Sequence, residues 1–158
     1  MFLDRPEPFL AAWPSDVLVA VEVRNQTWMA PELADCLRRH GAVWVLPDQA
    51  WMPSPLSVVE RLDVVTGPFG YVRLLGDRVA VDALTKTLDH IVIDRGGQVA
   101  ESARAIRSLR QRVPVVAFVN NHYAGYAPET ARQLVATTEW LRTFTGRCRR
   151  CWWRHGSS

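Results

Sequence analysis

Four apolar runs rich in β-branched residues recur along the chain, each bounded by polar residues, glycine or proline. They occupy residues 17–23, 42–46, 70–76 and 115–119. Near-continuous apolar runs of this length are typical of strands buried on both faces, as in parallel sheets. We therefore predict four strands, of which the first, second and fourth are buried.

Helical patterns separate these strands. The clearest spans residues 98–112, where Val99, Ala103, Ile106 and Leu109 form one apolar stripe and the arginines lie mostly off it. The other predicted helices span residues 8–13, 31–40, 56–62, part of 79–90, and 128–140, and residues 91–93 fit either a strand or a continued helix. Alternation of strand and helix predicts an α/β fold built from parallel β/α units.

Two architectures fit this pattern. Four strands can form an open sheet, or they can be a piece of a (β/α)₈ barrel, which typically needs about 250 residues. The chain has 158 residues, which favours one domain. We place that domain at residues 1–141 and treat residues 142–158, which lack apolar periodicity and acids, as a separate basic and disordered tail.

The charge of the chain resides in this tail. The net charge is +3, but five arginines lie from Arg142 onward with no acid among them. Removing these five from the 19 basic residues leaves 14 against 16 acidic residues, a net charge of −2 for the body. The body therefore gives no electrostatic argument for nucleic-acid binding. Only the tail, with its arginines and Trp152 and Trp153, offers that alternative.

The three cysteines and the chain start bear on location and metal binding. An odd count without an evident signal peptide favours free thiols and a cytoplasmic protein, and no apolar run is long enough to span a membrane. Cys36 is expected to be a buried core residue. Cys148 and Cys151 have CxxC spacing with His155 beyond them, but three candidates fall short of a four-ligand zinc set, so no metal site is predicted.

Polar side chains follow each predicted strand at its carboxyl end. They are Glu22 and Arg24, then Asp48, then Tyr71 and Arg73 within the third strand, then Asn120 and Asn121 before a helix that starts at Pro128. In parallel sheets these ends converge on one rim, where barrels and open α/β sheets hold ligands. Arg73 suits a carboxylate or phosphate through its planar fork, and Glu22 or Asp48 suits a general base or metal ligand.

A structural interpretation of the same residues stays open. Glu22 can form an ion pair with Arg73 or Arg24, and Asn120 and Asn121 can tie down the turn through backbone hydrogen bonds. His122 is then a turn-stabilising residue, because nothing near it in sequence completes a triad.

Three motifs carry a family resemblance. They are AVEVRNQTW at residues 20–28, YVRLLG at 71–76 and FVNNHYAGYAPETARQL at 118–134. In this order they resemble the YecE-like family, the domain of unknown function number 72, over residues 9–141. The resemblance implies a TIM-like barrel of about 250 residues with no established activity. The positions it carries over are Glu22, Arg24, Trp28, Asp48, Tyr71, Arg73, Asn120, Asn121, Gly125 and Tyr126.

The chain also departs from the family pattern. Asn25 and Leu75 stand where the family often has histidine, which removes two candidate acid–base or metal-ligating groups. The resemblance implies strands five to eight of the barrel, so the chain is expected to be a truncated or split copy. Half a barrel exposes two sheet edges, which favours a homodimer or a separately encoded N-terminal half as partner.

The resulting functional hypothesis is binding or catalysis of a small phosphorylated or other anionic ligand at the rim. The predicted catalytic residues are Glu22 and Asp48, and the predicted ligand-binding residues are Arg24, Trp28, Tyr71, Arg73, Asn120, Asn121 and Tyr126. The sequence does not identify a cofactor. The alternative is a non-catalytic half-barrel that acts as a subunit or protein-interaction partner.

Overall fold

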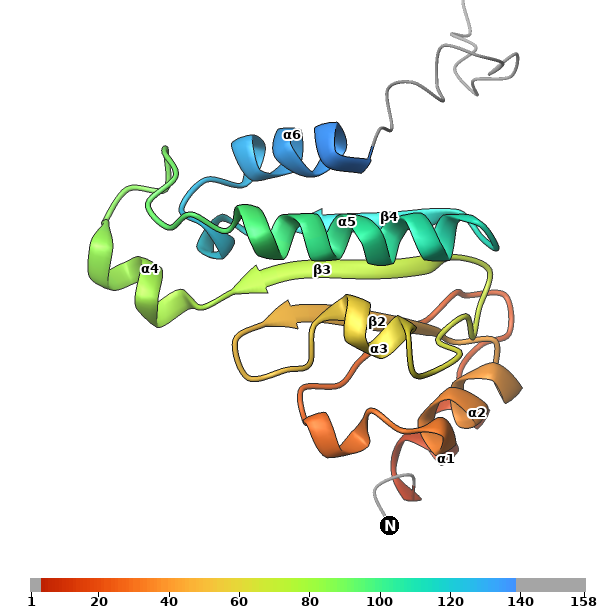
Figure 1. Ribbon diagram of the computed structural model, residues 1–158. Helices are drawn as coiled ribbons and strands as arrows, with labels where there is room; N and C mark the ends of the chain where they lie inside the picture. The colour runs from red at the N-terminus through yellow and green to blue at the C-terminus, as the bar shows by residue number, and fades with distance from the viewer. Residues whose placement is uncertain (1–3, 139–158) are drawn as a thin grey trace, which may run out of the picture.

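The computed structural model describes residues 4–138, and its centre is a four-stranded sheet (Figure 1). The strands are β1 (Ala20–Glu22), β2 (Val43–Gln49), β3 (Gly70–Gly76) and β4 (Val115–Val119). All three pairings are parallel and the order across the sheet is β1-β2-β3-β4. The predicted α/β fold with parallel units is confirmed.

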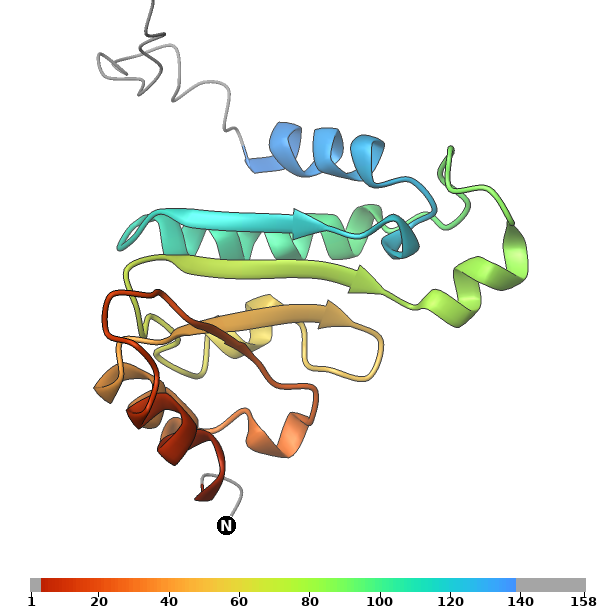
Figure 2. The same ribbon diagram turned by 180° about the vertical axis from the view of Figure 1, so that it is seen from behind.

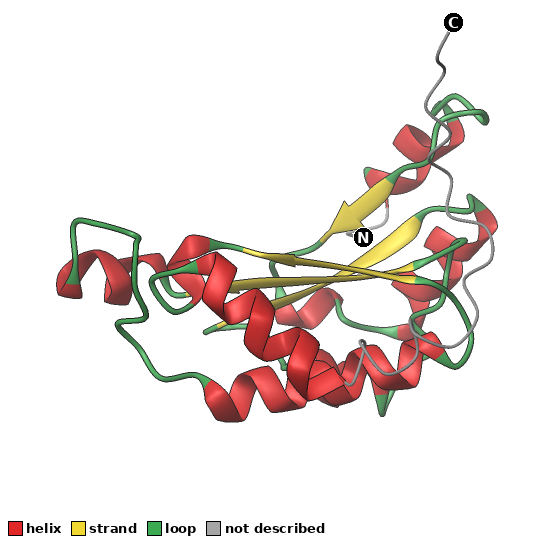
Figure 3. Cartoon of the chain, turned by 90° about the horizontal axis from the view of Figure 1, so that it is seen from above, coloured by secondary structure: helices red, strands yellow, loops and turns green. Residues whose placement is uncertain are grey.

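Helices connect successive strands. They are α1 (Pro6–Ala11), the 3₁₀ turn η2 (Gln26–Trp28), α2 (Pro31–Arg39), α3 (Pro55–Val59), α4 (Arg78–Leu84), α5 (Gly96–Arg110), the 3₁₀ turn η3 (Asn121–Tyr123) and α6 (Ala127–Thr138). The long helices gather on one side of the strands (Figure 3). Seen from behind, β3 and β4 lie in front of α5 and no helix crosses them, whereas the segment of β1 passes in front of β2 (Figure 2).

The core lies between the sheet and the helices. Val99, Ala103, Ile106 and Leu109 of α5 are each at most 3% exposed, so the predicted apolar stripe is confirmed. The strand residues that meet the helices alternate with those that do not, because successive side chains of a strand point to opposite faces. The buried strand side chains of this core include Trp44, Leu46, Val72, Leu74 and Val115.

The opposite face of the sheet has the complementary residues. Glu22, Val45 and Tyr71 are aligned across β1 to β3. Arg73 and Phe118 are aligned across β3 and β4. Phe118 is 52% exposed, so this open face carries apolar side chains that no described helix covers.

Two predictions about the strands are wrong in detail. The first strand has three residues instead of the predicted 17–23, because Val17 and Leu18 precede the pairing with β2 and remain exposed. None of its three residues is buried, contrary to the prediction, because β1 is an edge strand. The fourth strand has the predicted bounds, but only Val115 is buried, because β4 is an edge strand with one open face.

The second strand continues past Pro47 to Gln49. Pro47 cannot donate to a strand ladder and is normally confined to edges. It is tolerated here because β1 pairs only with residues 43–45 of β2, so at Pro47 only β3 is alongside.

The remaining predicted elements are confirmed with small shifts of their ends. Residues 91–93 form no regular element, and the Val92 and Ile93 N–H groups donate to the Ala124 carbonyl. The predicted helix end at 139–140 and the basic tail, with Cys148, Cys151 and the tryptophans, lie outside the described residues. Within residues 4–138 no helix is long and apolar enough to cross a membrane.

Candidate functional site

The carboxyl ends of β2, β3 and β4 enclose a hollow next to α4. Their arrows point the same way, toward α4 (Figure 2). The hollow has a volume of about 410 Å³. It is lined by Arg24, Gln49, Trp51, Arg73, Leu75, Gly76, Asp77, Arg78, Val79, Asn120 and His122. Of the predicted ligand-binding residues, Arg24, Arg73 and Asn120 therefore meet in one place.

Glu22 joins two of these arginines. Its carboxylate accepts a hydrogen bond from Arg73 with one oxygen and a 2.6 Å bond from Arg24 Nε with the other. The Glu22 side chain is 13% exposed, and that of Arg73 27% exposed. Two guanidinium groups share one carboxylate, so this cluster has an excess of one positive charge at the edge of the hollow.

Phe118 supports the same arginine from the other side. The Arg73 guanidinium lies over the Phe118 ring, 5.8 Å from its centroid, in cation–π geometry. Arg73 is thus held by Glu22 on β1 and Phe118 on β4, although the residue itself belongs to β3. The planar group has little freedom to leave this position.

The turn after β3 builds the opposite wall. Gly76 has φ +69, and Asp77 caps α4 by accepting from the Val79 and Ala80 N–H groups. One turn into α4, Asp82 contacts Arg78 Nε at 3.2 Å and His122 Nε2 at 3.3 Å.

The turn after β4 is organised by the two asparagines. The Asn120 side-chain oxygen accepts from the His122 N–H at 3.0 Å and contacts His122 Nδ1 at 3.2 Å. The Asn121 side-chain oxygen accepts from the Ala127 N–H at 2.9 Å, at the start of α6. Both residues thus tie down the turn, as the structural interpretation expects. Asn120 also lines the hollow, and its amide NH₂ makes no hydrogen bond within residues 4–138.

Asp48 faces away from this hollow, into the layer between sheet and helices. Its carboxylate accepts from Tyr123 Oη at 2.7 Å and from Ser102 Oγ at 2.9 Å. Burial raises the pKa of Asp48, and the two hydroxyl donors oppose that shift. Burial and the adjacent Asp48 also raise the pKa of Tyr123, so its hydroxyl keeps its proton. The structure therefore separates Asp48 from Glu22.

The other predicted residues lie apart from the hollow lining. Trp28 ends η2 and is 37% exposed, and Tyr71 stacks obliquely on Phe69 with centroids 6.3 Å apart. The Tyr126 carbonyl accepts from the Thr130 N–H in the first turn of α6. These three residues are not brought to the hollow that Arg73 lines.

Eight lining residues were not among the predicted site residues, and those with polar or aromatic side chains are Gln49, Trp51, Asp77, Arg78 and His122. Gln49 and Trp51 could have been found from the true end of β2, two residues after Pro47. The spacing of Arg78 and Asp82 on one helix face was also visible. The contact of His122 with Asp82 was not, because 40 positions separate the two residues in the sequence.

Comparison with known proteins finds a family and solved structures that are similar to this chain. A family model described as "Protein of unknown function DUF72" matches residues 3–147. A DUF72 family structure from Thermotoga maritima is similar with a TM-score of 0.60 and 20% identity, over 89% of this chain and 51% of that one. A DUF72 family structure from Enterococcus faecalis has a TM-score of 0.57 and 19% identity, over 87% of this chain and 53% of that one.

The chain belongs to the DUF72 family, and the predicted resemblance is confirmed. It spans about half the length of the solved structures it matches. No curated protein matches it. The similar structures are below 25% identical to this chain, so they support its fold and not a function.

Proposed function

We propose that this member of the DUF72 family binds a small anionic ligand, in the first place a phosphorylated molecule, in the hollow at the carboxyl ends of β2, β3 and β4. One observation carries the proposal: the Arg73 guanidinium lines the hollow while Glu22 and Phe118 fix its position. A planar guanidinium held in advance binds phosphate or carboxylate oxygens in a bidentate manner at a smaller entropic cost.

The residues around Arg73 suit this role. Arg24 adds a second guanidinium next to it, and Arg78 lines the wall that α4 supplies. The unused amide NH₂ of Asn120 offers a neutral donor to the same ligand. Because Asp77 and Asp82 balance part of this charge, we expect recognition of one or two anionic groups and not of a long polyanion.

Glu22 acts in this proposal as a positioning residue. Both oxygens of its carboxylate are engaged by arginines, one by Arg24 and the other by Arg73. Catalysis by Glu22 or Asp48 stays a prediction from the sequence. Binding at the hollow does not depend on it.

The proposal is tested by calorimetric titration with inorganic phosphate and with a panel of phosphorylated metabolites. Arg73→Ala is expected to weaken binding by about tenfold or more, which corresponds to one lost charge-assisted contact. Arg73→Lys keeps the charge but loses the fork, and should recover only part of the affinity. Arg132→Ala is the matched control, since Arg132 pairs with Glu129 on α6 away from the hollow. Equal affinities for the Arg73 and Arg132 variants would refute the role of Arg73.

A second candidate function is suggested by the open face of the sheet. The four parallel units follow one another in chain order, and the chain spans about half of its solved relatives. We propose that they correspond to the second half of a TIM-like barrel. Two copies related by a two-fold axis along the barrel would place β4 of each beside β1 of the other, which gives eight parallel strands, the number of a TIM barrel.

The homodimer would bury the apolar open face, where Val116 is 47% and Phe118 is 52% exposed. Light scattering coupled to size-exclusion chromatography distinguishes the dimer from the monomer by mass. A dimer mass over a wide concentration range supports this candidate. A monomer with a cooperative thermal transition contradicts it and leaves the ligand proposal intact.

A further inference from the structure

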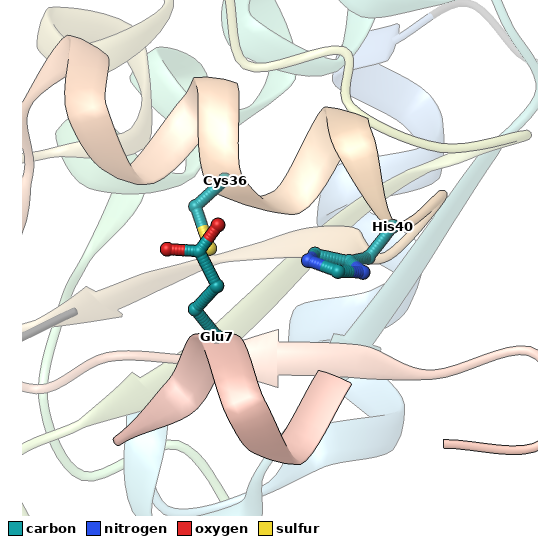
Figure 4. Close-up of side chains that lie close together, drawn as sticks. All are labelled: Glu7, Cys36 and His40. Carbon is teal, nitrogen blue, oxygen red and sulfur yellow. The ribbon is translucent and has the colours of Figure 1, made fainter. Parts of the chain in front are cut away.

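A second cluster of reactive side chains lies far from the hollow in the sequence, on the first two helices. We propose that Glu7, Cys36 and His40 bind a zinc ion that joins α1 to α2. One ligand atom of each residue lies within 4.8 Å of the others, a grouping not repeated within residues 4–138. Figure 4 shows the Glu7 carboxylate, from α1, next to the Cys36 sulfur, with the His40 ring on the same side of α2.

The helix geometry creates this arrangement. Cys36 and His40 are four positions apart, so they lie on one face of α2, with His40 at its C-cap. Glu7 lies in the first turn of the short helix α1, which packs through Leu10 as its buried residue. The three residues are thus brought together by the packing of α1 on α2, which the sequence does not reveal.

The donor set selects the metal. Thiolate sulfur, imidazole nitrogen and carboxylate oxygen are the ligands of zinc, whereas magnesium and calcium prefer oxygen alone. Zinc bonds of about 2.0–2.3 Å require ligand atoms closer together than 4.8 Å, so zinc binding would have to draw the three side chains inward. Three protein ligands leave the fourth tetrahedral position to water. The thiolate and the carboxylate together neutralise the divalent charge.

The other contacts of these residues are compatible with a metal. Glu7 uses one oxygen in an ion pair with Arg39 at 2.5 Å, which leaves its second oxygen to coordinate. The Cys36 and His40 side chains make no hydrogen bond within the described part of the chain. Cys36 is fully buried, and burial, with the nearby Glu7, raises its thiol pKa. Zinc binding would replace the thiol proton, which would be released to solvent.

Unlike the tail cysteines and His155, which are candidates by sequence spacing alone, these three ligands are grouped in space, and with water as the fourth ligand they form a more open set than the four protein ligands usual in structural zinc sites. His40 lies just before β2 begins, so the cluster belongs to the amino-terminal side of the strands, opposite the hollow. In barrels this side contributes stability and not catalysis. The ion would fix α1, a helix too short to be stable alone.

The test requires a background without the other cysteines. Cys148→Ser with Cys151→Ser leaves Cys36 as the one thiol of the chain, so tail cysteines cannot contribute. Cobalt(II) is titrated into this protein, and near-ultraviolet thiolate-to-cobalt absorption is recorded. We expect absorption that saturates at one equivalent and is competed away by zinc. Zinc should also raise the melting temperature of this background by several degrees.

Variants then identify the ligands. Cys36→Ala should abolish the absorption, and Glu7→Gln and His40→Ala should each weaken cobalt binding by tenfold or more. The matched control His90→Ala, whose imidazole is exposed and contacts Asp89, should bind as the background does. Glu7 and His40 are only partly buried, so their variants remain informative if Cys36→Ala fails to fold. Absence of thiolate-to-cobalt absorption, or equal binding by the Glu7 and His40 variants, would overturn the proposal.

Discussion

The Glu22 carboxylate on β1 accepts a hydrogen bond from the Arg73 guanidinium on β3, across the full width of the intervening strand β2. The two residues are 51 positions apart. Both lie on the open face of the sheet, and both side chains are largely shielded from water. This ion pair sets the position of the arginine on which the ligand proposal rests.

Glu22→Gln is expected to reduce the free energy of unfolding by about 1–2 kcal/mol, because Arg73 would lose a charged hydrogen-bond acceptor in a partly buried position. Urea denaturation of Glu22→Gln, Arg73→Met and the double variant measures the coupling between them. We expect a favourable coupling of about 0.5 kcal/mol or more. Strictly additive effects would show that the pair does not stabilise the sheet.

Asp48 is expected to make stability depend on pH. Its pKa is raised above the ordinary value of 3.8, so the native state binds the proton more tightly than the unfolded state. The resulting stabilisation is present below pH 3.8 and is lost as the pH rises through the native-state pKa. The Asp48→Asn variant should not lose stability at this position as the pH rises, because its side chain does not titrate. Its amide oxygen can still accept hydrogen bonds from Tyr123 and Ser102.

The stability of Asp48→Asn relative to wild type should therefore increase from acid to neutral pH. Urea midpoints at a series of pH values measure the difference. The control is Asp63→Asn, which should show the opposite trend, because the pKa of Asp63 is lowered by Arg112. A difference for Asp48→Asn that does not change with pH would contradict the prediction.

Gly76, which lines the hollow, is expected not to tolerate replacement by a residue with a Cβ. It has φ +69, and a Cβ there would lie 2.5 Å from the Tyr123 Cα, where the turn after β4 crosses the end of β3. Gly76→Ala should lower the free energy of unfolding by about 2–4 kcal/mol through strain and backbone displacement.

Gly97→Ala is the matched control. Gly97 lies in the first turn of α5, and no atom outside that turn lies within 4 Å of the position that an alanine Cβ would take. Alanine there should be neutral or stabilising by about 0.5 kcal/mol. Thermal unfolding followed by circular dichroism measures both variants. Equal melting temperatures would show that η3 does not approach β3 as closely as the structure has it.

Phe118→Ser is expected to weaken self-association if the open face forms a dimer. The variant removes an exposed apolar ring of that face, on the edge strand β4, and should shift the sedimentation equilibrium toward monomer by tenfold or more. Leu84→Ser changes a residue that is 62% exposed on α4 and should leave the equilibrium unchanged. An equal shift in both variants would indicate nonspecific association.

Much of the fold was predictable because its signals are local. Glycines mark both ends of β3, and the apolar stripe of α5 repeats with helical periodicity. The length of β1 was not predictable, because Val17 and Leu18 have the composition of strand residues and differ only in lacking a partner strand. The exposure of β4 was not predictable for the same reason, because an apolar run in the sequence does not show whether another element covers it.

The candidate site was predictable in place and only partly in composition. Arg24 and Asn120 follow strand ends, Arg73 lies within β3, and all three line the hollow as predicted. The sequence predicts His122 only as a turn residue, because its contact with Asp82 depends on α4 lying beside η3. Glu7, Cys36 and His40 come together only through the packing of two helices.

The sequence by itself determined the alternation of strands and helices, the parallel class of the sheet and the family, since these depend on periodicity and motif order. Only the tertiary structure decided which polar side chains share a face. Asp48 lies near the end of β2 and Arg73 in the middle of β3, yet the register of β2 against β3 turns Asp48 toward α5 and Arg73 toward the open face. A shift of one position reverses the face of a strand residue, and register is fixed by pairing between distant segments.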